Sequence, residues 1–412
     1  MIKIVLLILP AFLLAESLRE LIDISEQKND IVIAKQYQQK SKSKNLSSKN
    51  STYFPTLDLG GYYKRDDEAS PFQAGDTYSG FAKLSYDIYD GGKRSSLVDQ
   101  ADSSLKSSKF DTKAYKKSLA LQITQDFFTI KSLKATLSTR EEAQKSLKEQ
   151  LDRIKSFYEA KMATQDDIDR VQADYDTNVY DMESMKFQIL TLLSELSLKV
   201  GKPISTLDDS AFNKQDGDSF EQLDSIKSLI AKNNSIKYGA ASIDSFYYPN
   251  IKIEDTYSLY GYDREDPNLT RLGASPLDNQ NTLLLSLNFR VFDYGALRES
   301  KEAVLLTSQA LLSEIAYRTK EQTLEHKLAI SRVKTAKIRI ESAKSALNAS
   351  TSAFNTIEKK YNAGIVDYIV YLDALTKRTS SKALYESGLN ELEIAYAILY
   401  FYRGKNIKEE LK

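Results

Sequence analysis

The pattern of apolar and polar positions divides this chain into two kinds of segment. In the longer kind, apolar residues recur every three or four positions, which is the spacing of one face of an α-helix. No Gly or Pro, the strongest helix breakers, occurs between Gly92 and Gly201. The clearest run consists of Leu119, Ile123, Phe127, Ile130, Leu133 and Leu137. The pattern predicts helices over residues 18–50, 94–160, 165–200, 222–246, 296–361 and 366–403.

The shorter segments alternate with a period of two, which is typical of β-strands. They predict strands at about 53–65, 78–89, 250–262 and 281–292. Strands of about ten residues with one apolar face fit a transmembrane barrel. In the last strand the residues expected to face lipid are Leu283, Leu285, Leu287 and Phe289.

Four strands are too few to close a barrel, and an open edge in lipid leaves backbone groups unpaired. The chain must therefore oligomerise, or the strands belong to a soluble sandwich. A sandwich needs a second sheet over the apolar face, whereas only two hairpins are present, flanked by helices too long to cover them. The pattern therefore favours the barrel.

A tandem duplication accounts for the order of these segments. Short motifs recur in the same order, 194 residues apart before the first strand of each copy and 203 apart afterwards. The pairs are Tyr53-Phe54-Pro55 with Tyr247-Tyr248-Pro249, Asp90-Gly91-Gly92 with Asp293-Tyr294-Gly295, Tyr158 with Tyr361, and Gly201-Lys202 with Gly404-Lys405. We expect a first repeat at 16–202, a linker at 203–221, a second repeat at 222–403 and a tail at 404–412.

The amino terminus is typical of a cleavable secretory signal. Lys3 precedes an apolar run at 4–14, and Ala15 stands before Glu16. The run is shorter than the roughly 20 apolar residues that span a bilayer as a helix. We expect residues 1–15 to be removed and, because the chain has no Cys, the new terminus to carry no lipid.

Composition narrows the possible functions further. Basic and acidic residues number 57 each, which argues against a nucleic-acid partner because phosphates call for a basic excess. The sequence has neither a Gly-rich phosphate loop nor a nucleophile motif, so we expect no enzyme activity, no catalytic residues, no metal and no cofactor. Acidic residues between the strands, such as Asp66 and Asp67, fit a solvated loop better than a metal site, because they lack the order of a calcium loop.

These motifs together resemble the TolC family of outer-membrane channel-tunnels over essentially the whole mature chain. Their order, duplication and spacing carry the resemblance. It implies a mainly α fold with a membrane β-barrel part, in which a homotrimer of a tandem-duplicated helix-strand-strand-helix unit forms a 12-stranded barrel and a long helical tunnel. The implied location is the outer membrane of a Gram-negative bacterium, with the tunnel in the periplasm.

The resemblance also implies a set of site residues at the tips between the long helices. The tips contain Lys161 and Met162 in the first copy and Gly364 and Ile365 in the second. A periplasmic gate would involve Asp167, Tyr361 and Asp373, with Tyr361 donating a hydrogen bond to Asp167 in the closed state. From the residues alone, Asp167 also completes a capping box that begins at Thr164.

The chain departs from the family at three of these positions. Lys161 stands where the first tip usually has Gly, Val370 replaces a second mouth carboxylate, and Val366 replaces a basic latch residue. The family's ion selectivity and latch network therefore do not transfer intact.

The implied function is an exit duct of a tripartite efflux pump, with a periplasmic adaptor protein, an inner-membrane transporter and outer-membrane lipid as partners. Three other hypotheses stay open. The chain could be the exit duct of a type I protein secretion system. It could be a periplasmic coiled-coil protein that transports nothing, although this does not explain the alternating strands. It could also be an adaptor itself, which would be expected to have a strand-rich lipoyl-like domain and no duplication.

Overall fold

The computed structural model describes residues 16–68, 74–214, 219–263 and 277–412. The expected signal segment 1–15 and most of the loop inside the second hairpin lie outside these residues. The chain divides into two compact units. One contains 37–110 and 227–316, and the other contains 1–36, 111–226 and 317–412.

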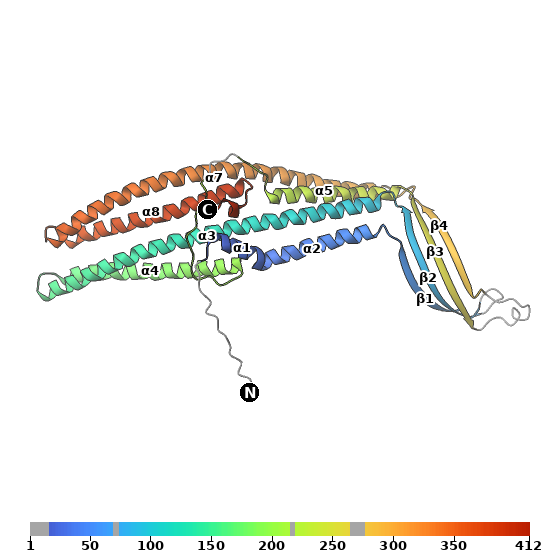
Figure 1. Ribbon diagram of the computed structural model, residues 1–412, viewed down its shortest axis with the longest axis horizontal. Coiled ribbons are helices and arrows are strands. Elements are labelled where there is room, and N and C mark those ends of the chain that lie inside the picture. Colours follow the sequence, from blue (N-terminus) through green and yellow to red (C-terminus); the bar gives the residue numbers. More distant parts are fainter. Residues whose placement is uncertain (1–15, 69–73, 215–218, 264–276) are drawn as a thin grey trace, which may run out of the picture. The chain divides into compact units, whose positions relative to one another are not determined.

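The first of these units contains a four-stranded antiparallel sheet in the order β1-β2-β3-β4 (Figure 1). The strands are β1 (Thr56–Arg65), β2 (Asp76–Tyr89), β3 (Asn250–Asp263) and β4 (Asn279–Asn288). Leu57 pairs with Leu84 in the first hairpin, and Ile251, which lies 194 positions after Leu57, pairs with Leu287, which lies 203 positions after Leu84. The two hairpins therefore have the same register, as a duplication requires.

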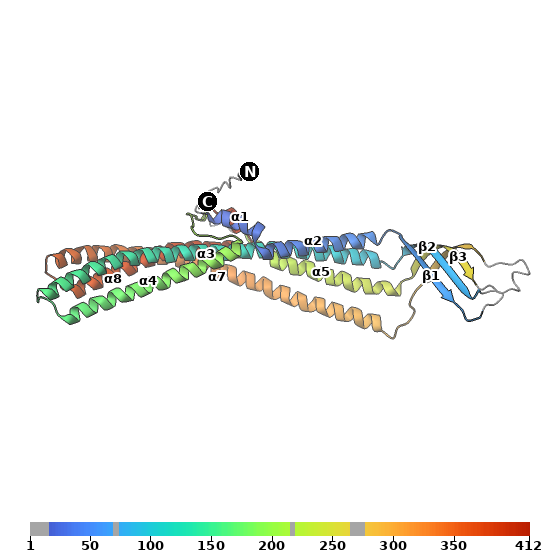
Figure 2. The same cartoon turned by 90° about the horizontal axis from the view of Figure 1, so that it is seen from below.

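Helices continue from the sheet in the same unit. They are the later part of α2 (Asp30–Ser51), the start of α3 (Lys93–Glu159), α5 (Asp224–Asp244) and the start of α7 (Ala296–Asn362). In Figure 2, α5 runs between α3 and α7. Its serine and asparagine side chains bond to both, with 2.9 Å between the hydroxyls of Ser235 and Ser104 and 2.7 Å between Asn233 and Ser308.

β2 and β4 each lead into a helix, α3 and α7, through the same kind of turn. Asp90 accepts hydrogen bonds from the backbone N–H groups of Gly92 and Arg94, and Asp293 accepts them from Gly295 and Leu297. A carboxylate at this place satisfies donors that the first turn of a helix leaves unpaired. The duplicated Asp-x-Gly motif is thus a helix cap.

The other unit is built from two long helical hairpins. The first is the later part of α3 with α4 (Gln165–Val200), and the second is the later part of α7 with α8 (Tyr368–Tyr402). Short elements α1 (Leu18–Lys28) and η2 (Ile407–Glu410) complete the unit. Phe212 pairs in an isolated bridge with Leu411, which ties the linker at 203–221 to the tail.

An aromatic cluster is the centre of this unit. Phe212 is fully buried, and its ring centroid lies 6.2 Å from that of Phe128 and 5.7 Å from that of Tyr400. Phe127 is 5.2 Å from Phe128, and Tyr396 is 6.0 Å from Tyr400. Helices α3 and α8 and the linker therefore share one core, although they are far apart in the sequence.

Two expected boundaries were wrong. The helix expected at 18–50 is interrupted at Asn29, whose backbone is extended and whose side chain accepts from the N–H groups of Ile31 and Val32 and donates to the carbonyl of Lys199. The strand expected at 281–292 ends at Asn288. Asn288 lies opposite Asn250, the first residue of β3, so the residues after it have no partner strand in this chain.

No helix within the described ranges is both long and apolar enough to cross a membrane.

Replacing Phe212 should test the central cluster. Phe212→Ala removes a fully buried ring and should lower the free energy of unfolding by about 3–5 kcal/mol. Phe187→Ala is the matched control, because the Phe187 side chain is 69% exposed and its loss should change the free energy by less than about 0.5 kcal/mol. Denaturant unfolding of both variants in detergent, followed by circular dichroism, measures the difference. Equal losses would contradict the central role of Phe212.

Candidate functional site: helical tips, groove and sheet faces

The first helical tip turns through a residue in the left-handed conformation. Lys161 has a φ of 60°, its N–H donates to the carbonyl of Tyr158, and the next N–H, of Met162, donates to the carbonyl of Phe157. The second tip repeats this turn with Gly364 at a φ of 71°. An L-residue pays a steric cost there that Gly does not. Lys161 therefore keeps the turn that Gly provides in the other copy.

Both tips expose an apolar side chain directly after the left-handed residue. Met162 is 74% exposed and Ile365 is 70% exposed. Exposed apolar groups at matched positions of two copies are suited to contact with another molecule.

The expected capping box at the start of α4 is confirmed. The Thr164 hydroxyl accepts from the N–H of Asp167, and the Asp167 carboxylate accepts from the N–H of Thr164 at 2.9 Å and from its hydroxyl at 2.7 Å. These hydrogen bonds, the one from the Thr164 backbone first, hold the pKa of Asp167 below its usual value. The cap therefore depends on the charged carboxylate and should weaken when acid protonates it.

The hydrogen bond expected between Tyr361 and Asp167 is not formed in this structure. The Tyr361 hydroxyl instead donates to Oε1 of Gln150 on α3 at 2.8 Å. The guanidinium of Arg153 lies 5.3 Å from the centre of the Tyr361 ring. The same ring stacks on Tyr371, with 4.8 Å between centroids. Asp167 is occupied by its cap, so Gln150 is the acceptor that α3 presents to α7. We call Gln150, Arg153 and Tyr361 the tip clamp.

A second contact between the hairpins lies beside the tip clamp. Tyr368, the first residue of α8, packs on the apolar cluster of Leu151, Ile154 and Val171 from α3 and α4. Its buried hydroxyl has no hydrogen-bond partner among the residues that the structure describes. Burial, and then the nearby carboxylate of Asp174, raises the pKa of this hydroxyl. Apolar packing and not a hydrogen bond therefore holds this contact.

Asp373 lies on α8 with its side chain exposed and has no ion pair among the described residues. Val370, one turn earlier, is 41% exposed. Of the three expected gate residues, the structure thus joins only Tyr361 to the other hairpin.

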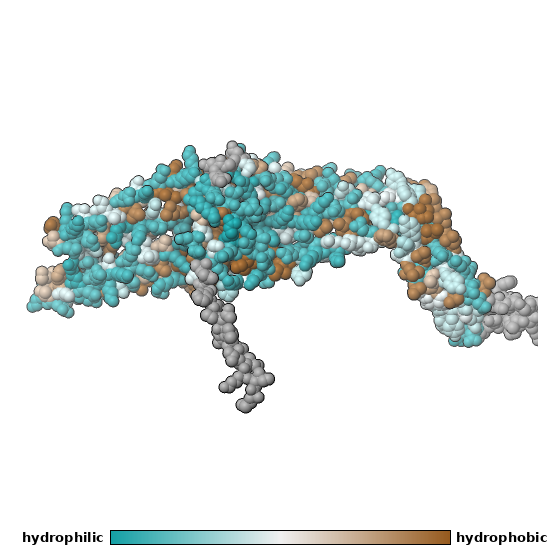
Figure 3. Space-filling model, in the orientation of Figure 1, coloured by the Kyte–Doolittle hydropathy of each residue, from teal (hydrophilic) through white to brown (hydrophobic). Residues whose placement is uncertain are grey.

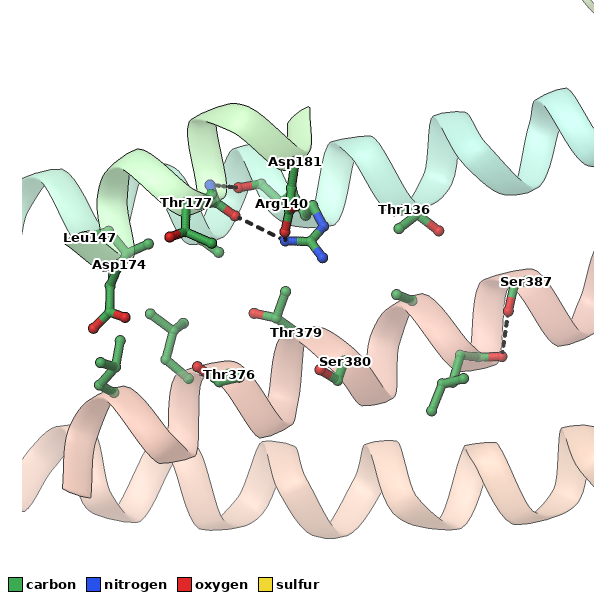
Figure 4. Close-up of a pocket in the computed structure, with 16 residues that line it drawn as sticks. Thr136, Arg140, Leu147, Asp174, Thr177, Asp181, Thr376, Thr379, Ser380 and Ser387 are labelled. Carbon is green, nitrogen blue, oxygen red and sulfur yellow. Dashed lines mark hydrogen bonds and ion pairs between the residues drawn. The ribbon is translucent and has the colours of Figure 1, made fainter. Parts of the chain in front are cut away.

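A groove of about 540 Å³ separates the two hairpins above the tips (Figure 4). One wall carries the ion pair of Arg140 and Asp181, with 2.8 Å between nitrogen and oxygen, and Asn178, whose side chain donates to the Arg140 carbonyl. The facing wall, from α8, presents small hydroxyl residues, namely Thr376, Thr379, Ser380 and Ser387. Small residues leave room for another helix to approach closely.

The pairing of the strands separates apolar from polar residues on the two faces of the sheet. Because paired residues point to the same face, the register places Leu57, Leu84, Leu283, Leu285 and Leu287 on one face with Ile251 and Ile253. In Figure 3, hydrophobic residues gather over the part of the sheet nearer the helices. Leu283, Leu285 and Leu287 are 58–68% exposed, so the described part of this chain leaves them uncovered.

The opposite face is polar and carries a charged cluster. The Glu254 carboxylate lies 2.6 Å from the Lys83 ammonium and 2.8 Å from that of Lys252. Glu254 of the second repeat therefore neutralises Lys83 of the first repeat. Phe289 lies beyond the end of β4 and is 57% exposed, so its expected place on the apolar face of a strand is not formed in the single chain.

Asp255 interrupts the apolar face between Leu84 and Leu283. Its Oδ1 is shielded from solvent and, within the described ranges, has no hydrogen-bond partner. We have no physical account of a carboxylate at this position.

Sequence reasoning missed Gln150, Arg153 and Tyr368. All three lie within regular helical patterns, where nothing distinguishes them from other surface residues. Only the approach of the α7–α8 hairpin to α3 gives them partners.

The comparisons with known proteins agree with this geometry. Residues 21–196 match the family model described as outer membrane efflux protein. No curated protein sequence matches the chain. Three solved structures illustrate the similarity of fold. The Campylobacter jejuni CmeC outer membrane channel has a TM-score of 0.83 at 14% identity, covering 94% of this chain and 85% of that one.

The outer membrane protein VceC of Vibrio cholerae has a TM-score of 0.79 at 13% identity, with coverages of 95% and 96%. The open state of the Neisseria gonorrhoeae MtrE outer membrane channel has a TM-score of 0.79 at 16% identity, with coverages of 95% and 90%. The fold is therefore that of the TolC-like outer-membrane channels. Residues 21–196 carry the sequence similarity to the outer membrane efflux protein family, the family that the duplicated motifs resemble.

Proposed function

We propose that this protein is the exit duct of a tripartite efflux pump, in which three copies form a 12-stranded barrel in the outer membrane and a helical tunnel in the periplasm. One observation carries the proposal: the sheet has one apolar face, one polar face and two unpaired edges, β1 and β4. In lipid the edge N–H and C=O groups must be paired, and only other copies of the chain offer matching strands. The number three comes from the family resemblance.

In this arrangement the apolar face meets lipid and the polar face lines the channel. The cluster of Glu254, Lys83 and Lys252 would then repeat three times around the channel wall. Cargo would pass these side chains after it leaves the tunnel.

The tip clamp would be part of the closed gate. Its hydrogen bond is neutral, so its net contribution is about 0.5–1.5 kcal/mol, and the cation–π contact of Arg153 adds about 0.5–1 kcal/mol at an exposed site. Because these two contacts are weak, the binding of a partner protein would be enough to open the closed state.

The groove between the hairpins would receive a helix of the periplasmic adaptor. Its hydroxyl-bearing wall on α8 allows close approach, and the ion pair on the other wall supplies polar contacts. The exposed Met162 and Ile365 at the tips offer an apolar contact to the same partner.

Cell fractionation tests the whole proposal. The protein should appear in the outer-membrane fraction as a trimer that dissociates on heating, and crosslinked cells should yield an adaptor and an inner-membrane transporter. Capture of a protein-secretion transporter would favour the type I alternative. A protein released without detergent would favour the scaffold that transports nothing.

The two faces of β4 should respond differently to charge. Leu285→Arg places a cation in lipid, which costs about 2–4 kcal/mol per protomer near the middle of the membrane, and should abolish the assembled trimer. Ser286→Arg, one residue on, points to the polar face and should assemble while changing single-channel conductance. Gel analysis of trimers and planar-bilayer recordings measure both. Equal tolerance at the two positions would contradict the assignment of faces.

Loss of the clamp should favour opening. Tyr361→Phe removes the hydrogen bond to Gln150 but keeps the stack on Tyr371, so openings in bilayers should become about 2- to 10-fold more frequent, as expected for 0.5–1.5 kcal/mol. Trimer stability should not change. Gln150→Leu should have the same effect, whereas Asp167→Asn should not reproduce it. A conductance change in Asp167→Asn alone would restore the pairing first expected from the family.

Filling the groove should block the adaptor. Ser380→Trp introduces a large ring into the space of about 540 Å³ and should reduce capture of the adaptor in crosslinked cells. Ser345→Trp on the exposed side of α7 is the control and should leave capture unchanged. Trimer formation should be normal in both variants. Undiminished capture by Ser380→Trp would show that the adaptor binds elsewhere, with the tips as the remaining candidate.

A further inference from the structure

The two strand-to-helix turns are built alike but differ at one position. The turn after β2 has Gly91 at a φ of 66°, and the turn after β4 has Tyr294 at a φ of 56°. A left-handed φ is costly for a bulky aromatic residue. Tyr294 also has its side chain 92% exposed, with the ring of Phe292 4.6 Å away as its ring contact. Among the residues that the structure describes, no closely packed neighbour offsets the strain, which points to a contact outside the chain.

At the equivalent turn inside the chain, Gly91 packs against Ser245 and Tyr248. A Cβ on Gly91 would come within 2.6 Å of the Ser245 carbonyl oxygen and 2.7 Å of the Tyr248 Cβ. Ser245 and Tyr248 form the turn that leads into β3. Only Gly fits at position 91, because that turn packs directly on its Cα.

The duplication predicts the neighbour of Tyr294 in the assembly. Tyr294 lies 203 positions after Gly91, and the residues 194 positions before Ser245 and Tyr248 are Ser51 and Phe54, which lead into β1. The two helix-to-strand turns match, because the N–H of Phe54 donates to the Ser51 carbonyl at 3.1 Å and that of Tyr248 donates to the Ser245 carbonyl at 3.1 Å. Since β1 is at the opposite edge of the sheet from β4, only a second molecule of this protein can bring its Ser51 and Phe54 to Tyr294.

The repeat also predicts how the two edge strands pair between chains. Tyr86 pairs with Ile253 inside the chain. Phe289 is the repeat counterpart of Tyr86, 203 positions later, and Leu59 is the counterpart of Ile253, 194 positions earlier. The same pairing between chains therefore places Phe289 opposite Leu59 of the next chain. This would extend β4 beyond Asn288, where it ends in the single chain for lack of a partner. Leu59 is 79% exposed and so is free to be covered.

Yet the junction between chains cannot copy the one within a chain. If it did, the Tyr294 Cβ would lie about 2.6–2.7 Å from the Ser51 carbonyl and the Phe54 Cβ of the next copy, as an added Cβ on Gly91 does at its own neighbours. Heavy atoms do not approach so closely without displacement of the backbone. The seam must open around the side chain.

Resting on the proposed assembly, we infer that Tyr294 is a wedge at the seam between chains, with its ring seated against Phe54 of the next copy. Phe54 is 71% exposed in the single chain and provides an aromatic surface for that contact. Three wider seams then alternate with three narrower junctions within the chains, so the six repeats around the barrel base are not equivalent.

Cysteine crosslinking tests the wedge on a clean background, because the chain has no Cys. The pair Phe54→Cys with Tyr294→Cys should be joined between chains by a short bismaleimide, giving covalent dimers and trimers on denaturing gels. Simple oxidation should join it poorly, because a disulfide needs Cβ atoms about 3.5–4.5 Å apart. The pair Tyr248→Cys with Tyr294→Cys is the control and should give no product between chains.

A second pair separates failure of the wedge from failure of the assembly. Leu59→Cys with Phe289→Cys reports the edge pairing alone and should crosslink between chains. If this pair reacts and the pair at 54 and 294 does not, the wedge is wrong and the barrel stands. Ready oxidation of the pair at 54 and 294 would show a narrow seam and would also overturn the wedge. If neither pair reacts and the membrane-inserted protein is a single chain, the proposed assembly fails.

Discussion

The unpaired backbone groups along β1 and β4 are the constraint on which the rest of the structure depends. A four-stranded sheet with one apolar face is stable in lipid only when its edge groups find partners. The two hairpins have matching registers, so each chain can be one repeating piece of a larger sheet. The edge strand β4 corresponds to β2, which pairs with β3 inside the chain. In the proposed assembly, closure follows from this strand pairing and needs no further contacts.

The long helices α3 and α7 continue from the sheet. Asp90 and Asp293 cap α3 and α7 with the same hydrogen bonds, so both helices leave the sheet through equivalent turns. At their other ends the hairpins contact one another through the tip clamp and through Tyr368. These interactions are small, which would suit the proposed gate, whereas the buried cluster around Phe212 is large and suits a permanent core.

Duplication explains most of this architecture, and the exceptions to it are informative. Lys161 against Gly364 and Gly91 against Tyr294 are the positions where one copy keeps Gly in a left-handed turn and the other does not. At the tips the substitution leaves the turn unchanged. At the turns after β2 and β4 the difference matters for packing. The Ser245 carbonyl lies directly beside Gly91, whereas Tyr294 is exposed to solvent.

Periodicity, punctuation and repeated motifs determined the helices, the four strands, the faces of the sheet and the cap at Thr164 and Asp167, because each of these depends on residues near in sequence. They did not determine the break at Asn29 or the end of β4, which depend on a distant carbonyl and on the length of a partner strand. Nor could they find the acceptor of Tyr361. Gln150 is 211 positions away on α3, and a glutamine on an exposed helical face has no signature until a second hairpin packs against it. Helices, strands and caps depend on neighbouring residues and can be predicted from the sequence, whereas contacts between distant residues depend on how the helices pack.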